Sequence, residues 1–105
     1  MADTSSEFHH PGEVLRDEFL IPRGISQARL AKELSLPPSE LEAIIHARRS
    51  ITPDVALRLA RSLGTSERFW LQLQVRYELE RARALARAAV AIPARRPPAP
   101  LAYAS

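Results

Sequence analysis

The sequence predicts an all-α fold, a bundle of five helices within a chain of 105 residues. Three observations favour this fold. Apolar residues recur at three- and four-residue spacing in successive segments, and no segment shows the alternation of a half-buried strand. Helix start and stop residues separate these segments. One pair of segments has the spacing of two short helices that are joined by a tight turn.

The first helix is expected over residues 12–20. Pro11 fits a first turn, where a missing N–H breaks no helical hydrogen bond, and Pro22 and Gly24 are expected to end the helix. Its inward side consists of four apolar residues, Val14, Leu15, Phe19 and Leu20.

The second and third helices are expected over residues 27–34 and about 38–46. Ser26 precedes the second helix, and its hydroxyl can accept a hydrogen bond from a backbone N–H of the first turn. The inward residues of the second helix are Ala28, Leu30, Ala31 and Leu34. Those of the third helix are Leu41, Ile44 and Ile45.

The fourth helix has clear signals at both ends. Thr52 is the expected N-cap, Pro53 takes the first helical position, and Gly64 supplies the left-handed residue that ends the helix. Its inward residues are Ala56, Leu59, Ala60 and Leu63.

The fifth helix is expected to begin after Thr65 or Ser66 and to run to about residue 89, a rod about 36 Å long. It carries apolar residues on two sides. One side holds Phe69, Trp70, Leu73 and Tyr77. The other holds Leu71, Val75 and Leu79. Two apolar sides need two partners, so we predict that the second side is a homodimer interface. A helix sunk deeper into its own domain is the alternative.

The second and third helices together fit a helix-turn-helix motif. Ala31 gives the small side chain that a steep helix crossing requires, and Leu36 can plug the turn beside it. Leu41 and Ile44 follow at fixed distances in the next helix. An arbitrary pair of small-domain helices is the alternative reading.

A wider resemblance extends from His10 to about Tyr77, through "HPGEVLRDEFL", "GISQARLAKEL" and "RRSITPDVALRLARSLGTSERFWLQLQVRYEL". These segments resemble the HigA group of antitoxins, within the phage-repressor-like (Xre, lambda-repressor-like) helix-turn-helix family. The resemblance implies a dimeric bundle of about five helices, which binds an inverted-repeat operator in double-stranded DNA, represses its own operon and holds a HigB-like toxin that cleaves mRNA. Some relatives are stand-alone regulators without a toxin.

Candidate DNA-binding residues follow from the motif. Gln27 begins the second helix and is placed to bond a phosphate, and Arg48 and Arg49 follow the third helix, with His46 beside them. Arg29 and Lys32 are further candidates for the DNA backbone. The outward residues of the third helix, Ser39, Glu40, Glu42 and Ala43, are the candidates for base contacts.

Three residues of this motif depart from what DNA binding favours. Pro37 stands where relatives usually carry a capping Ser or Thr, and Ser35 replaces a frequent Gly in the turn. Glu40 can accept a hydrogen bond from the amino group of cytosine, so it can specify a base although it weakens affinity. Alternatively, the glutamates are solvated charges on a protein–protein adaptor that has lost DNA binding.

Charge divides the chain into two parts. Residues 1–80 hold ten Lys and Arg against twelve Asp and Glu, whereas residues 81–105 hold five Arg and no acid. We predict a flexible arm at 1–9, a domain at 10–90 with the dimerisation helix, and a disordered tail at 91–105 that is rich in Pro, Ala and Arg. The basic tail can reach nucleic acid, or it is an inert solubilising segment.

Other chemistry is not expected. The chain has no Cys, which excludes disulfides and thiol catalysis, and it has no membrane-length apolar run, so we expect a cytoplasmic protein. His9 and His10 are adjacent and lack ligand spacing, so no metal is predicted. Without a phosphate loop or nucleophile motif, we expect neither a cofactor nor an enzyme.

Overall fold

Residues 9–89, which the computed structural model of this chain describes, fold into helices and turns without a β-strand. The elements in chain order are α1 (Pro11–Val14), the π-helical turn η2 (Leu15–Leu20), α2 (Ile21–Arg23), α3 (Gln27–Leu34), α4 (Pro38–Ile45), α5 (Pro53–Leu63) and α6 (Glu67–Ala88). The first three follow one another without a break, so these residues form the five predicted helical segments. The predicted tail at 91–105, and the arm at 1–9 apart from His9, lie outside the described residues.

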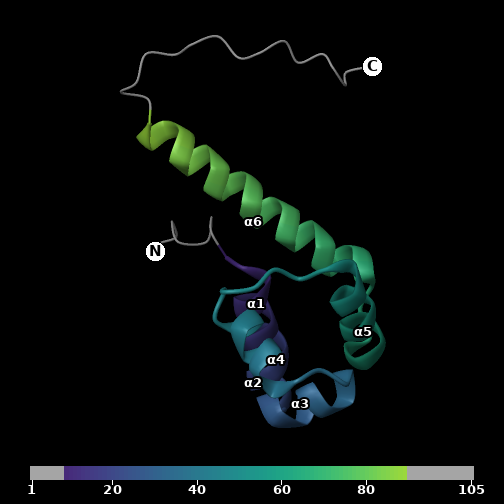
Figure 1. Ribbon diagram of the computed structural model, residues 1–105. Coiled ribbons are helices and arrows are strands. Elements are labelled where there is room, and N and C mark those ends of the chain that lie inside the picture. The colour runs from purple at the N-terminus through teal and green to yellow at the C-terminus, as the bar shows by residue number, and fades with distance from the viewer. Residues whose placement is uncertain (1–8, 90–105) are drawn as a thin grey trace.

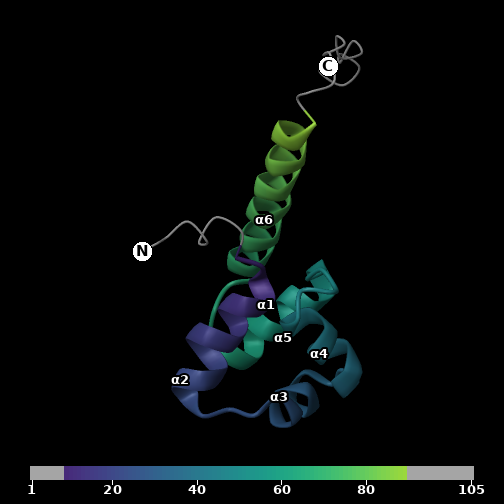
Figure 2. The same cartoon turned by 90° about the vertical axis from the view of Figure 1, so that its left-hand side faces the viewer.

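The first five α-helices gather into a bundle, and α6 projects from it (Figure 1). In both views α3 lies at the end of the bundle farthest from α6, and most of α6 extends beyond the other helices (Figure 2). The core between them consists mainly of aliphatic side chains from every segment, closed at the α6 end by Trp70.

The first helical segment is longer than the sequence predicts. It continues through Pro22 and ends at Gly24, which has a left-handed φ of 65°. The N–H of Ile21 donates to the carbonyl of Arg16, five residues back, so the turn before the proline is wider than an α-helical turn. This π-helical turn accommodates the ring of Pro22 and places both Leu15 and Leu20 in the core.

The predicted helix-turn-helix is confirmed at α3 and α4. Ala31 is buried at their crossing, Leu36 packs against the core from the turn, and Ser35 has a left-handed φ of 57°. The cap at Ser26 is also confirmed, because its hydroxyl accepts from the N–H of Arg29. The prediction for Ala28 is wrong, since this residue is exposed. The buried side of α3 is formed by Leu30, Ala31 and Leu34.

The ends of α5 and α6 also agree with the sequence. The Thr52 hydroxyl accepts from the N–H of Val55, and the Ser66 hydroxyl accepts from the N–H of Phe69. Gly64 ends α5 in the left-handed conformation. These caps satisfy N–H groups that a helix leaves without a partner in its first turn.

An aromatic cluster fixes α6 against the first helical segment. The ring of Trp70 lies 5.2 Å from that of Phe19 and 4.9 Å from that of Phe69, measured between centroids. The indole N–H of the buried Trp70 donates to the Thr65 hydroxyl at 2.7 Å. The N-terminal part of α6 is therefore held against the bundle by aromatic packing and by the hydrogen bond of the indole N–H.

The first helix also touches α4 at a position where only glycine fits. A Cβ atom on Gly12 would lie 1.9 Å from the carbonyl oxygen of Ile44. The start of α1 thus sits directly against the last turn of α4. None of the helices in residues 9–89 is long and apolar enough to cross a membrane.

Candidate nucleic-acid interface

The outward surface of α4 consists of the four predicted base-facing residues. Three inward residues, Leu41, Ile44 and Ile45, are almost completely buried. With 100° between successive residues, Ser39 and Ala43 point away from this core. The carboxylates of Glu40 and Glu42 flank them, one on either side. Ser39 and Glu42 are exposed, whereas Glu40 and Ala43 are partly covered.

The start of α3 presents a second part of the surface. Gln27 is the first residue of this helix, and it is exposed. Backbone N–H groups of this first turn point outward, with only that of Arg29 taken by the Ser26 hydroxyl. A phosphate is the ligand that such a helix end favours. The side chain of Arg29 pairs with Glu33 at 3.2 Å, and Lys32 is exposed.

The turn before α4 is held from outside the motif. Pro37 gives α4 no side-chain cap, as the sequence predicts. Arg58 of α5 donates from one guanidinium nitrogen to the carbonyl of Leu34 at 2.9 Å and to that of Ser35 at 3.1 Å. The same side chain pairs with Asp54. Arg58 therefore satisfies carbonyls at the end of α3 and braces the left-handed Ser35.

The arginines after α4 lie in a second turn, residues 46–51, which we call the arginine turn. Ala47 is left-handed, with a φ of 61°. The N–H of Arg48 donates to the carbonyl of Ala43 at 2.8 Å, which closes the end of α4. This closure leaves Arg48 and Arg49 exposed immediately beyond the helix.

A buried glutamine of α6 holds the other end of this turn. The Gln74 carbonyl oxygen accepts from the N–H of Ile51 at 2.8 Å. Its amide nitrogen donates to a carboxylate oxygen of Glu78 at 2.9 Å, and lies 3.4 Å from the Ser50 hydroxyl. The arginine turn is therefore fixed between α4 and α6.

Free charges remain on this surface. Within residues 9–89, no ion pair involves Glu40, Glu42, Arg48 or Arg49. The Nδ1 atom of His46 lies 3.2 Å from the carbonyl oxygen of Glu42, so this ring folds back onto α4. The surface thus offers two carboxylate acceptors on the helix and two guanidinium groups at its end.

The structure brings the candidates on α4 and in the arginine turn into one continuous surface. Gln27 stands apart from them, at the start of the neighbouring helix. The sequence interpretation missed the bracing residues Arg58 and Gln74. Each acts across more than twenty residues, and only the position of Gln74 beside Leu73 on an apolar side could have signalled that it is buried.

The predicted homodimer residues differ in exposure. Val75 and Leu79 are 55% and 48% exposed, but Leu71 packs partly against the core. Leu85, which the sequence interpretation did not include, is also exposed on this helix. The homodimer interface remains a prediction.

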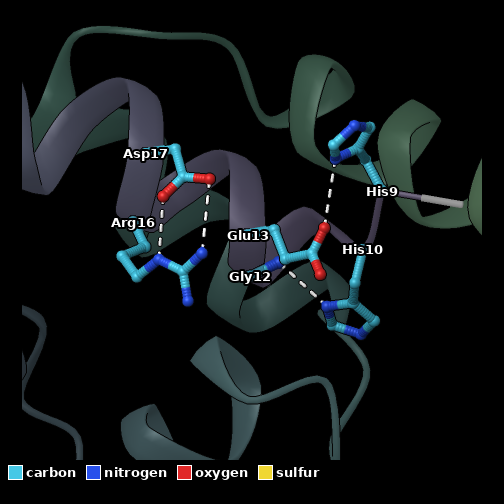
Figure 3. Close-up of polar contacts among 6 residues, drawn as sticks. All are labelled: His9, His10, Gly12, Glu13, Arg16 and Asp17. Atoms are coloured by element: carbon cyan, nitrogen blue, oxygen red, sulfur yellow. Dashed lines mark hydrogen bonds and ion pairs between the residues drawn. The ribbon is translucent and has the colours of Figure 1, made fainter. Parts of the chain in front are cut away.

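Two histidines considered for metal binding have other roles. The ring of His9 lies 3.1 Å from a carboxylate oxygen of Glu13, and Nδ1 of His10 accepts from the N–H of Gly12 at 2.8 Å (Figure 3). Burial lowers the pKa of His10, an effect that the nearby carboxylates of Glu13 and Glu78 partly oppose. His10 is therefore the N-cap of α1.

Comparisons with known proteins agree with this architecture. The profile of a family described as Helix-turn-helix matches residues 16–70. Virulence-associated protein I of Dichelobacter nodosus is 47% identical over 73 residues, which cover 70% of this chain and 68% of that protein. The structure of Pseudomonas aeruginosa antitoxin HigA with the higBA promoter is 39% identical, with a TM-score of 0.75 over 84% of this chain and 96% of that chain. An addiction module antidote protein of a HigA family from Coxiella burnetii is 36% identical, with a TM-score of 0.74 over 87% and 99%.

Proposed function

Because this chain belongs to the helix-turn-helix family and, within it, to the HigA-type antitoxins, we propose that it is a sequence-specific DNA-binding antitoxin. It binds double-stranded operator DNA as a homodimer, represses its own operon in the cytoplasm, and neutralises a HigB-like toxin that cleaves mRNA. One observation carries the DNA part: the outward side of α4 is free of core contacts and continues directly into two exposed arginines.

In this mechanism α4 enters the major groove and its outward side chains meet the base edges. Glu40 and Glu42 lie on either flank of the inserted side, and each carboxylate can accept from the exocyclic amino group of cytosine. Ser39 can donate or accept, and Ala43 offers a methyl group to thymine. The preferred half-site therefore contains a cytosine within reach of each carboxylate.

Affinity comes from the ends of the motif. Gln27 and the N–H groups of α3 bind one phosphate, and Arg48 and Arg49 bind the backbone on the other side of the groove. His46 adds a contact where its ring reaches the backbone. These groups set position, and their contribution decreases as salt increases.

The homodimer supplies the second half-site. Val75 and Leu79 form an exposed apolar strip on α6, which a second copy of the same strip would cover, with Leu71 at its edge. A two-fold arrangement places two copies of α4 about 34 Å apart, one helical turn of DNA, on an inverted repeat. The domain at 10–90 is sufficient for this assembly. Toxin capture is supported by membership of the antitoxin group.

The deciding experiment combines co-purification with a gel shift. The full chain is expressed with the product of the adjacent gene, and the complex is tested on their shared promoter. We expect retention of the neighbouring protein and a shifted band, which the double variant Arg48→Ala with Arg49→Ala weakens on every sequence. Promoter binding without a protein partner would instead identify a stand-alone regulator. Retention of a partner without promoter binding would identify an adaptor.

A second experiment tests base reading at α4. Site selection with random duplexes is run on the wild-type chain and on Glu40→Gln, which keeps the length of the side chain but adds an N–H donor. We expect the preferred base to change at one position, with a discrimination of about 1–3 kcal/mol there. The same consensus for both proteins would remove Glu40 from the reading surface.

A further inference from the structure

A small cavity lies between the arginine turn and α6. It has a volume of about 140 Å³, and its wall includes three arginines, Arg48 and Arg49 from the turn and Arg81 from α6. Pockets for drug-sized ligands occupy about 300–1,000 Å³, so this cavity suits a single small group. The remaining wall is formed by His10, Ala47, Ser50, Gln74, Tyr77 and Glu78.

His10 contributes a hydrogen-bond donor to this wall. Its Nδ1 atom accepts from the N–H of Gly12, so the neutral ring carries its proton on Nε2 (Figure 3). Nε2 has no hydrogen-bond partner within residues 9–89, although the residue as a whole is only 3% exposed. No buried side-chain nitrogen or oxygen in the described part lacks a partner, and the ring that carries this N–H lines the cavity. Among the cavities described, the ring borders only the one beside the arginine turn.

The ring is fixed in that position. Tyr77 contacts it edge-on with centroids 4.8 Å apart, and Gly12 places the start of α1 against α4. The N–H on Nε2 is therefore a preorganised donor, and its geometry does not depend on a mobile side chain.

The charge of the wall favours an anion. The wall includes three arginines and one acidic residue, Glu78, whose carboxylate already accepts from the amide of Gln74. Within residues 9–89, none of the three arginines takes part in an ion pair. A small group with several acceptor oxygens and a negative charge would satisfy both the arginines and the His10 donor.

We propose that this cavity binds one phosphate group of the DNA backbone. Arg48 and Arg49 hold the phosphate from the arginine turn, and Arg81 and His10 hold it from outside the helix-turn-helix. The assignment rests on the proposed DNA-binding function and extends it to α6. Arg81 lies about 120° around α6 from Val75, so the exposed apolar strip and the phosphate site use different sides of the same helix. The long helix would then both pair two chains and touch the duplex.

The test measures promoter affinity against salt concentration for the full chain by fluorescence anisotropy. Arg81→Ala is compared with Arg87→Ala, a matched control on the last turn of α6 that does not border the cavity. We expect Arg81→Ala to weaken binding about tenfold for each chain of the homodimer, and to reduce the slope of log affinity against log salt by about 0.9 for each lost phosphate contact, about 1.8 for the dimer on its operator. Arg87→Ala should leave both quantities unchanged.

A second variant changes the sign of the effect. Glu78→Gln keeps an acceptor for the Gln74 amide but removes the negative charge from the cavity wall, so it should tighten promoter binding. Equal behaviour of Arg81→Ala and Arg87→Ala, or unchanged affinity in Glu78→Gln, would overturn the site while promoter binding by the wild type would still support the proposed function. Wild-type protein that fails to bind its promoter would overturn both.

A third arm identifies the source of the phosphate. Inorganic phosphate is titrated into DNA-free protein while the amide signals of residues 47–50 and 74–81 are followed by NMR. Binding that is saturated at micromolar phosphate, together with unchanged promoter affinity in Arg81→Ala, would assign the cavity to a free anion and overturn the DNA assignment. Shifts that appear only at millimolar phosphate and vanish in Arg81→Ala would support it.

Discussion

The two turns that flank α4 are built alike but braced differently. Each contains a left-handed residue that is not glycine, Ser35 before the helix and Ala47 after it. Each is held by a side chain from a later helix, Arg58 for the first turn and Gln74 for the second. Arg58 bonds carbonyls near solvent, whereas Gln74 bonds the buried N–H of Ile51. The second turn therefore depends more strongly on the side chain that holds it, because water cannot replace a hydrogen-bond partner in the core.

The largest effect is expected at Gln74. Gln74→Met keeps the volume of the side chain but removes the acceptor for the Ile51 N–H. A buried donor without a partner costs about 1–3 kcal/mol, so the free energy of unfolding should fall by about 2 kcal/mol in urea denaturation. Gln72→Met, at an exposed position of the same helix, is the control and should change stability by less than about 0.5 kcal/mol. Equal effects in the two variants would contradict the buried brace.

The corresponding change in the first turn is expected to be smaller. About a third of the Arg58 side chain is exposed, at 36%. In Arg58→Met, water can reach the carbonyls of Leu34 and Ser35, so we expect a loss of about 1 kcal/mol in the same measurement. Arg61→Met, at an exposed position one turn along α5, is the control. A loss as large as that of Gln74→Met would mean that the first turn is shielded from water.

Glycine substitutions test the feature that the turns share. A left-handed conformation costs a residue with a Cβ about 1–2 kcal/mol, and substitution by glycine removes this strain. Part of the gain in stability is lost, because glycine makes the unfolded chain more flexible. Ser35→Gly and Ala47→Gly should therefore each raise the unfolding free energy by about 0.5 kcal/mol. Ser39→Gly, a change at a right-handed helical position, should lower it by about the same amount. A decrease in either turn variant would show that entropy exceeds strain there.

The same two turns show where sequence interpretation is sufficient. At Ser35 the sequence carries a local signal for the left-handed conformation, because Ser replaces a frequent Gly in the turn, although no left-handed φ is predicted there. The conformation was missed at Ala47, since alanine is a strong helix former and carries no turn signal. The caps at Ser26 and Thr52 were predicted for the same reason of locality: an oxygen and an N–H three residues apart are enough.

The braces could not be predicted because they depend on how helices cross. Arg58 and Ser35 are 23 residues apart, as are Gln74 and Ile51, and neither pair shares an element. The first helix failed in another way. Pro22 normally ends a helix, and the prediction followed that rule, but the π-helical turn before it kept the segment helical. The outward residues of α4 were predictable because, once the inward apolar residues of a helix are known, its periodicity determines which residues face outward.

The last prediction concerns the pH dependence of stability, which should involve the second turn and not the first, and its effect should be the smallest. Of the two turns, only the second lines a described cavity together with His10, whose pKa is lowered by burial while the carboxylates of Glu13 and Glu78 partly offset this effect. Tyr77 contacts the other side of the ring edge-on. The folded state therefore binds the proton less well than the unfolded chain. The stability that neutral His10 contributes is fully present above the unfolded pKa of 6.5 and decreases as the pH falls below that value.

The measurement is the unfolding free energy between about pH 7.5 and pH 5, compared with His10→Asn. Asparagine keeps an oxygen that can accept from the Gly12 N–H but does not titrate in this range. His9 and His46 are present in both proteins, so the difference between the two curves isolates His10. We expect the wild type to lose more stability on acidification than the variant. Parallel curves would show that protonation leaves the cap intact. The second turn would then be as insensitive to pH as the first, and its dependence on buried partners would rest on Gln74 alone.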